Sequence, residues 1–164
     1  IDIGCESSRP GANPISDKEE IRRLEIILPY LSSIKNIKLS IDTYKPNVAK
    51  YALLNGFTII NDIKAGSESL EMFEIASNSN SEIILMHMKG VPLNMQNNPK
   101  YDNIIDEISL FLEKRAIKIA TIDKTNPITL FKFNSSSLSQ LSYFLFLGKY
   151  FKTLSTFVSS FLII

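Results

Sequence analysis

The segment IKLSIDTYKP, residues 37–46, combines an apolar run, a few polar residues and a proline. The run from Ile37 to Ile41 is typical of a short buried strand. Pro46 suits the first turn of a helix, because the N–H that proline lacks would have no partner there. The segment therefore predicts a strand that is followed at once by a helix.

The same alternation of strand and helix continues on both sides of this segment. The capping box SDKE, residues 16–19, predicts the start of the first helix. Alternating strands and helices are typical of an α/β fold in which helices cover a parallel sheet. The apolar stripe of the first helix is formed by Ile21, Leu24, Ile27, Leu28 and Leu31, with Glu20 among the polar residues off it. Further strands are expected at residues 1–4, 58–60, 82–86 and 127–130, and helices at residues 17–31, 46–55, 68–77 and 101–120.

Composition disfavours several classes of protein. With 164 residues, 45% of them hydrophobic, the chain can bury the core of one ordinary domain, so a disordered protein is disfavoured. The formal net charge of +1 gives no electrostatic reason to expect a nucleic acid or a membrane as partner. Cys5 is the only cysteine and cannot form an internal disulfide.

The last part of the chain differs from the rest. Residues 131–164 contain no acidic residue, yet they hold seven of the ten phenylalanines. A membrane span is disfavoured, because Lys149 and Lys152 interrupt apolar runs that are shorter than the roughly 20 residues needed. An amphipathic packing helix is an alternative. We favour the hypothesis that the original reading frame of an AT-rich gene is lost near Leu130. Two units are therefore expected, residues 1–126 and a divergent tail at residues 127–164.

Candidate site residues follow from the polarity of the strands. In α/β folds the ligand-binding groups lie at the carboxyl ends of parallel strands, where the loops meet on one face. This rule selects residues 5–12, Asp42 with Thr43, Asn61 with Asp62, and His87, which together outline a small-molecule site. Alternatives remain open: Asp42 or Thr43 could cap a helix, the Asn61 pair could form a turn, and His87 could be an interior residue.

Four segments in series carry a resemblance to a known family. They are DIGCESSRPGA at residues 2–12, SIDTYKP at residues 40–46, IINDI at residues 59–63 and LMHMKGVP at residues 85–92. These segments resemble the motifs of dihydropteroate synthases, which are pterin-binding TIM-barrel enzymes. The resemblance covers about residues 1–126.

The resemblance implies an activity and a set of ligands. Dihydropteroate synthases join 6-hydroxymethyl-7,8-dihydropterin diphosphate to p-aminobenzoate and release pyrophosphate with Mg²⁺ present. It further implies a cytoplasmic enzyme, often homodimeric, with small-molecule substrates. By resemblance, Asp42 and Asn61 would bind the pterin ring, and the loop with Arg9 would cover p-aminobenzoate. Substrate binding is thereby assigned to Ser8, Arg9, Pro10, Asp42, Asn61, Met86 and His87, with no metal ligand among them.

Departures from the family pattern limit this expectation. Cys5 replaces the second glycine of the family's DIGG motif, so the loop could be strained if that position needs a positive φ. The first-strand motif, whose Asn helps to bind Mg²⁺, and the later pterin-binding Asp have no match, and neither do the family's later Lys and its C-terminal Arg and His. We therefore expect about strands two to six of a (β/α)8 barrel without synthase activity, and two exposed sheet edges unless the tail covers one. The alternatives are a pterin-binding methyltransferase domain and a non-catalytic pterin-binding fragment.

Overall fold

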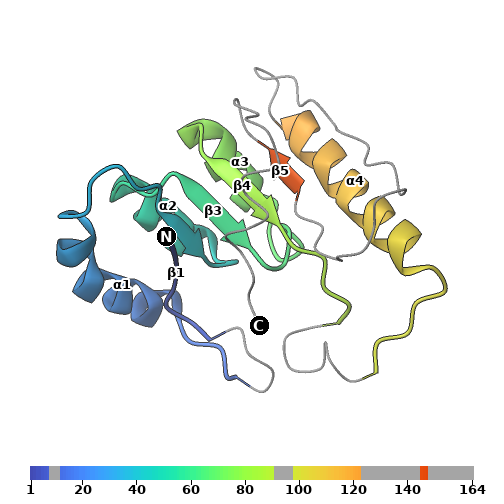
Figure 1. Ribbon diagram of the computed structural model, residues 1–164, viewed down its shortest axis with the longest axis horizontal. Coiled ribbons are helices and arrows are strands. Elements are labelled where there is room, and N and C mark those ends of the chain that lie inside the picture. Colours follow the sequence, from blue (N-terminus) through green and yellow to red (C-terminus); the bar gives the residue numbers. More distant parts are fainter. Residues whose placement is uncertain (8–11, 91–97, 123–144, 148–164) are drawn as a thin grey trace.

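A computed structural model describes residues 1–7, 12–90, 98–122 and 145–147. Strands and helices alternate along these residues, as the sequence predicts (Figure 1). The elements are β1 (Asp2–Gly4), α1 (Asp17–Leu31), β2 (Ser40–Asp42), α2 (Pro46–Leu54), β3 (Ile59–Asp62), α3 (Glu71–Ser79), β4 (Glu82–Leu85), α4 (Ile104–Ile122) and β5 (Leu145–Leu147).

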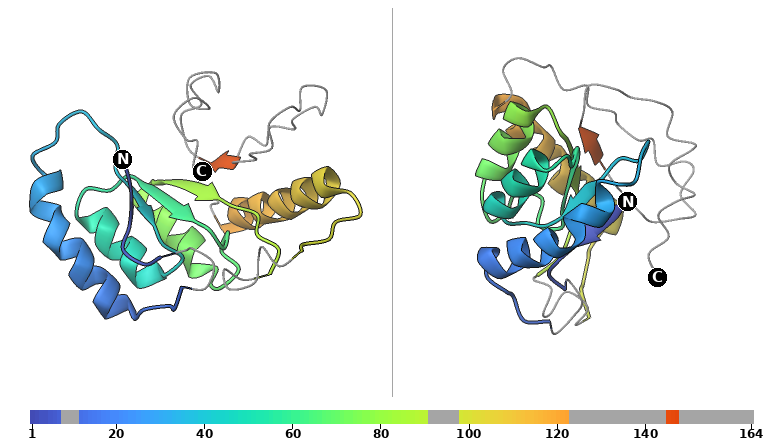
Figure 2. Two further views of the ribbon diagram at one scale, coloured as in Figure 1. Left: turned by 60° about the horizontal axis from the view of Figure 1, so that its bottom comes forward. Right: turned by 90° about the vertical axis from the view of Figure 1, so that its left-hand side faces the viewer.

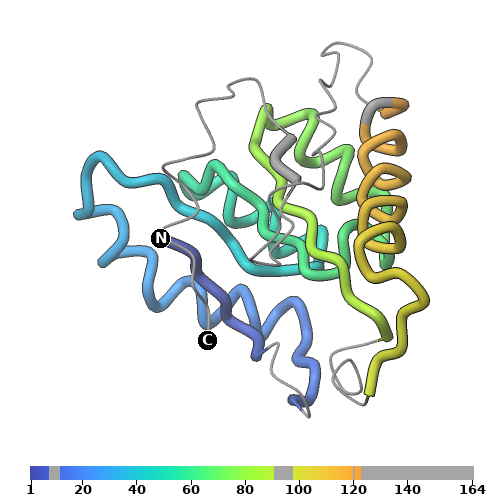
Figure 3. Tube along the Cα trace, turned by 45° about the vertical axis from the view of Figure 1, so that its right-hand side comes forward, coloured from blue at the N-terminus to red at the C-terminus, as the bar shows by residue number. Residues whose placement is uncertain are grey.

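The strands form one sheet in the order β1-β2-β3-β4-β5. The first four are parallel, and each neighbour in the sheet is also the next strand in the chain. Figure 2 shows the four helices on one face of this sheet. Figure 3 shows β1 and α1 at one end of the layer and α4 at the other. This arrangement is the wall of a TIM barrel, seen over about half of its circumference.

The first helix begins where the capping box predicts. Ser16 has an extended backbone, and its Oγ accepts a hydrogen bond from Glu19 N at 3.2 Å. Leu24, at the centre of the predicted stripe, is fully buried. The placement of Glu20 off the stripe is wrong, because this side chain is only 1% exposed. Glu20 faces Lys45, a partner from a distant part of the chain that helical periodicity does not include.

The cap on α1 supports a first prediction. We expect Ser16→Ala to lower the free energy of unfolding by about 1 kcal/mol, because the amide of Glu19 loses its acceptor. The matched control is Ser33→Ala, whose hydroxyl donates only to the exposed carbonyl of Tyr30. Urea denaturation of both variants measures the difference. Equal losses in the two variants would mean that the Ser16 cap does not stabilise α1.

Several element boundaries differ from the prediction. β2 begins at Ser40 rather than at residue 37, and Ile37 is 45% exposed. α3 begins at Glu71 rather than at residue 68. α4 begins after Asn103, because the Oδ1 of Asn103 accepts from the amides of residues 105 and 106 and so caps the helix. The boundaries predicted for α2 are confirmed, with Pro46 in its first turn and Gly56 after its end.

The sheet has two chemically different rows of residues. Ile3, Ile41, Ile60 and Ile83 lie side by side in the strand register, and they contribute to the core beneath the helices. The next row along the strands points to the opposite face, because side chains alternate in a strand. This second row consists of Gly4, Asp42, Asn61 and Ile84. Polar groups are therefore placed on the face that would line the barrel interior.

β5 covers the edge of β4. The edges of the partial barrel are expected to be exposed unless the tail covers one, and Leu145–Leu147, in the tail, pairs with β4 in the antiparallel sense. A complete (β/α)8 barrel would continue with a parallel strand at this place. The strand expected at residues 127–130 lies outside the described residues, as does the rest of the tail. Among the described strands, β1 and β5 therefore form the two edges of the sheet, since β1 pairs only with β2 and β5 only with β4.

Candidate functional site

Two of the predicted site residues lie side by side on the barrel-interior face. Asp42 ends β2 and is the register partner of Asn61 in β3. On its other side Asp42 is the register partner of Gly4. A Cβ at Gly4 would lie 3.3 Å from Asp42 Oδ2, so the glycine leaves the Asp42 carboxyl the space that it occupies. The strand register thus brings together the acid and the amide that the sequence selected.

Asn61 is oriented by an acid from the first strand. Its Nδ2 donates to Asp2 Oδ2 at 3.0 Å, which leaves its Oδ1 and one N–H for a ligand. Asp2 Oδ1 and the hydroxyl of Ser40 are buried and have no partner within the described part of the chain. Buried polar groups are usually hydrogen-bonded, so unpartnered ones indicate a place where polar ligand atoms or water are needed.

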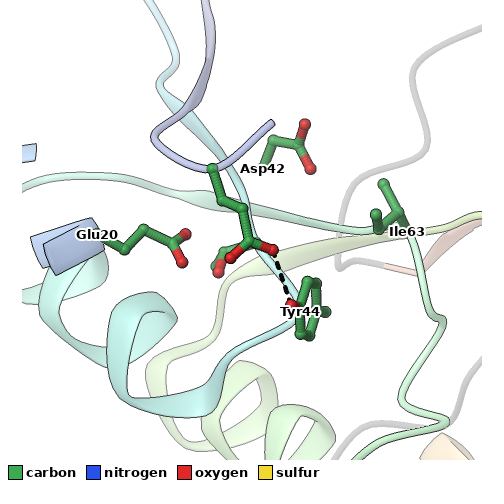
Figure 4. A pocket seen from close by; sticks show the side chains of 6 residues that line it. Glu20, Asp42, Tyr44 and Ile63 are labelled. Atoms are coloured by element: carbon green, nitrogen blue, oxygen red, sulfur yellow. Dashed lines mark hydrogen bonds between the residues drawn. The ribbon is translucent and has the colours of Figure 1, made fainter. Parts of the chain in front are cut away.

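An open pocket lies at the carboxyl end of β2 (Figure 4). The residues that line it are Glu6, Glu20, Asp42, Thr43, Tyr44 and Ile63. Three of them are carboxylic acids from three different elements or loops. Two of these acids, Glu6 and Glu20, share the ammonium group of Lys45. No hydrogen bond or ion pair from a described residue reaches Asp42, so its charge is the least compensated of the three.

The surroundings of Asp42 change its acidity. Burial, followed by the negative charges of Asp2, Glu20, Asp62 and Glu6, raises the pKa of Asp42 from 3.8 to about 7. The carboxyl group is therefore balanced between its neutral and ionised forms near neutral pH. A ligand that offers N–H donors would favour the ionised form, because a carboxylate accepts hydrogen bonds on both oxygens.

The turns after β2 and β3 are organised by Thr43 and Asp62, the residues that follow Asp42 and Asn61. Thr43 Oγ1 accepts from the amide of Lys45 at 3.2 Å and shapes the turn into α2. Asp62 accepts from the amides of Lys64 and Gly66 at 2.9 and 2.6 Å, so it organises the turn after β3. Both residues are buried and act on the backbone. Asp42 and Asn61, one position earlier in each strand, keep their side chains on the interior face.

The remaining candidates are less close to this pair. His87 follows β4 and packs edge-on against Phe111 in α4, with ring centroids 5.0 Å apart, and near Tyr101 at 5.9 Å. Burial, together with the charge of Lys89, lowers the pKa of His87. His87 is half-buried, and these ring contacts hold it against α4 and the loop before it. Met86 precedes it and is half-buried, with its amide donating to Asp62 O. The predicted residues Ser8, Arg9 and Pro10 lie outside the described residues.

Cys5 stands where the family has a glycine, but its backbone is not in a conformation that needs one. Residues with positive φ in the described chain include Gly56, Gly66 and Gly90, but Cys5 is not one of them. Its thiol is half-buried, and burial raises its pKa. The Cys5 carbonyl accepts from Arg23 Nη1 at 3.0 Å and is thereby fixed to α1. The start of this loop is thus compatible with a residue other than glycine.

Sequence reasoning did not select Glu20, one of the three acids that line the pocket. Glu6 lies in the motif ESSRPG and Lys45 in the motif TYKP, but the motifs alone give neither residue a role. Glu20 carried no such signal, because a glutamate in the first turn of a helix is ordinary. Only the contact with Lys45, 25 residues away in sequence, distinguishes it.

The described residues include neither a candidate metal cluster nor a membrane-spanning helix. They contain no group of three or more His, Cys, Asp or Glu side chains that could hold a metal ion. Among the described helices, none has the length and apolar character needed to cross a membrane.

The fold and the site define part of a TIM barrel with a small polar pocket at the carboxyl end of β2. The family described as "Pterin binding enzyme" matches residues 1–129 of this sequence. The chain belongs to this pterin-binding enzyme family.

Several relatives carry a more specific name. The dihydropteroate synthase of Synechocystis sp. is 40% identical over 111 residues, which are 68% of this chain and 38% of that protein. The Yersinia pestis dihydropteroate synthase, solved as a sulfonamide drug complex, has a TM-score of 0.69 at 35% identity, over 74% of this chain and 44% of that one. The Burkholderia cenocepacia enzyme complexed with 7,8-dihydropteroate has a TM-score of 0.64 at 38% identity, over 74% of this chain and 43% of that one. The chain therefore spans about two fifths of the length of these relatives.

Proposed function

We propose that this chain is the pterin-recognising part of a dihydropteroate synthase. The observation that carries the proposal is the adjacency of Asp42 and Asn61 on the barrel-interior face, in a family that binds pterins. The names of the relatives favour the synthase over the methyltransferase alternative. The substrates of the whole reaction would be a dihydropterin diphosphate and p-aminobenzoate, in the cytoplasm.

The chemistry of the two side chains suits the edge of a pterin ring. A pterin offers an amino group and a ring N–H as donors, together with a carbonyl and ring nitrogens as acceptors. Ionised Asp42 accepts two N–H groups, and the amide of Asn61 supplies both a donor and an acceptor. Because Asp2 already holds one N–H of Asn61, the orientation of that amide is set before the ligand arrives.

Binding of a pterin should depend on pH through Asp42. With a pKa of about 7 in the free chain, Asp42 must lose a proton to accept the ligand N–H groups. We therefore expect the affinity for 6-hydroxymethylpterin to be steady above pH 8 and to fall by about tenfold for each pH unit below 7. Calorimetric titration of the full chain between pH 5 and 9 measures this dependence. An affinity that is constant over this range would contradict a role for Asp42.

We expect pterin binding without synthase turnover. Pyrophosphate release in the whole enzyme needs positive charge and a metal ion at the leaving group. The family motif whose Asn helps to bind Mg²⁺ has no match in this sequence, so we assign the ion no step in this chain. Dihydropteroate formation, assayed with both substrates and Mg²⁺, should stay at background. Turnover at a rate typical of an intact enzyme would contradict this expectation.

A further inference from the structure

Asp2 reaches across a strand to hold the amide of Asn61. Asp2 lies in β1 and Asn61 in β3, and β2 separates these two strands in the sheet. Even so, Asn61 Nδ2 donates to Asp2 Oδ2 at 3.0 Å. The carboxyl group of Asp2 therefore lies over β2 on the barrel-interior face, the same face on which Asp42 and Asn61 are neighbours.

The carboxyl group of Asp2 also lies close to Asp42. Asp2 is the register partner of Ser40, and Ser40 lies two residues before Asp42 on the same face of β2. Burial is the first cause of the raised pKa of Asp42, and the negative charge of Asp2 is the next. Asp2 thus contacts one residue of the candidate site and acts on the charge of the other.

Stability does not explain an acid at this position. Asp2 Oδ1 is buried and has no partner within the described part of the chain, and the same holds for the hydroxyl of Ser40, its neighbour in the register. A buried polar atom without a hydrogen bond costs stability, so the fold alone would favour an apolar side chain here. The contact with Asn61 supplies a functional reason instead.

The contact with Asp2 decides the direction of the Asn61 amide. A carboxylate has only acceptors, whereas an amide has an acceptor on one side and two donors on the other. The Nδ2 side of Asn61 must therefore face Asp2. Asn61 Oδ1 and the second N–H are then held in fixed places for a ligand, and without Asp2 the amide would be free to turn over and exchange them.

Two related rings present opposite patterns to such an amide. In a pterin, the amino group is a donor and the ring nitrogen next to it is an acceptor. A lumazine has a carbonyl in place of the amino group, and the ring nitrogen next to it carries a hydrogen, so donor and acceptor are exchanged. An amide that is held in one direction pairs with only one of these patterns, while a free amide turns to pair with either.

We propose that Asp2 is a positioning residue that makes the site selective for pterins over lumazines, because it holds the Asn61 amide in the direction that a pterin needs. This inference rests on the proposed function, in which Asp42 and Asn61 bind the ring. A site that hydrogen-bonds its ligand rejects an analogue that leaves the polar groups of the site unpaired. We therefore expect the unaltered chain to bind 6-hydroxymethylpterin at least about 100-fold more tightly than 6-hydroxymethyllumazine.

The first test observes the amide of Asn61 without a ligand. Asp2→Asn keeps the size of the side chain but offers donors as well as an acceptor, so it no longer fixes the direction of Asn61. The variant should fold, since it removes a negative charge next to Asp42. By NMR on the full chain, we expect the N–H of Asn61 that Asp2 holds to exchange with water about tenfold faster or more. Unchanged exchange of this N–H would overturn the positioning role.

The second test measures the selectivity of the site. Calorimetric titrations at pH 8, where Asp42 is mostly ionised, compare the two rings. In Asp2→Asn we expect the ratio of the two affinities to fall by about tenfold, the effect of one misdirected hydrogen bond. The matched control is Asp17→Asn, because Asp17 also accepts from an asparagine amide, that of Asn47 at 2.8 Å, but lies at the start of α1. This control should leave the ratio unchanged.

The outcomes separate this inference from the proposed function. Equal losses for both rings in Asp2→Asn would show that Asp2 only stabilises the site, and would overturn its selective role. An unaltered chain that binds the two rings equally well would also overturn the selectivity, while pterin binding itself would still support the proposed function. If the unaltered chain binds neither ring, the proposed function fails and the selectivity fails with it, and the exchange of the Asn61 N–H still decides whether Asp2 holds the amide.

Discussion

Asp42→Asn is expected to stabilise the chain by about 3–4 kcal/mol at pH 8, because an amide removes a charge that the fold disfavours. The pKa of Asp42 is raised from 3.8 to about 7 in the folded chain by burial and by four neighbouring acids. A raised pKa means that the folded state holds the proton more tightly than the unfolded state does. The favourable contribution is thus fully present below pH 3.8 and is lost as the pH rises through 7.

The same substitution should remove the pterin site. An asparagine can offer one acceptor where the carboxylate offers two charged ones, so we expect the affinity for 6-hydroxymethylpterin at pH 8 to fall by about 10- to 100-fold. The gain in stability and the loss of binding would then come from one carboxyl group. Such a trade-off between stability and binding is typical of functional sites, where a strained or charged group is retained because the function needs it.

Urea denaturation at pH 5, 6, 7 and 8 measures the stability effect. The difference between Asp42→Asn and the unaltered chain should be about 1–2 kcal/mol at pH 5, should grow as the pH rises and should be nearly complete by pH 7. Asp102→Asn, in the exposed loop before α4, is the matched control and should change the stability by under about 0.5 kcal/mol throughout. A gain that does not depend on pH would show that Asp42 titrates normally. Unchanged pterin affinity would show that Asp42 is not a ligand.

Local rules predicted the half of the site that depends on strand polarity. Asp42 and Asn61 were selected because each ends a parallel strand, and the register then places them together. Ser16 and Pro46 were also sufficient to predict the starts of α1 and α2, because the interactions that begin a helix involve only a few consecutive residues. These features were predictable because their causes are contained in short segments.

Long-range contacts were beyond the sequence. The burial of Glu20 depends on Lys45, and periodicity places a glutamate at that position in solvent. β5 pairs with β4 across 60 residues, and no pattern in the tail indicated an antiparallel strand. In both cases the deciding partner is distant in sequence, and a local pattern contains no information about it.

Gly66→Ala is expected to be among the most damaging small substitutions in the described chain, with a loss of about 2–4 kcal/mol in the free energy of unfolding. Two costs add. The φ of Gly66 is +66°, which costs a residue with a Cβ about 1 kcal/mol. A Cβ there would also lie 2.7 Å from Cε1 of Phe73, a fully buried side chain, and overpacking of this kind costs about 1–3 kcal/mol.

Gly56→Ala isolates the first of these costs. Gly56 has a φ of +92°, but a Cβ there would have nothing within 4 Å. We therefore expect Gly56→Ala to cost about 1 kcal/mol, so that the excess in Gly66→Ala reports the contact with Phe73. Urea denaturation gives both values. In a Phe73→Leu background, which removes the ring, the cost of Gly66→Ala should approach that of Gly56→Ala.

The turn at Gly66 also connects the core to the site. The Gly66 amide donates to Asp62, the residue after Asn61, and Ile63 in the same turn lines the pocket. If Phe73 fixes the turn, displacing Gly66 moves Asp62 and Ile63 with it, and the affinity for a pterin should fall as the turn shifts. Similar losses in Gly66→Ala and Gly56→Ala would mean that the ring of Phe73 yields, and that the turn after β3 is set by Asp62 alone.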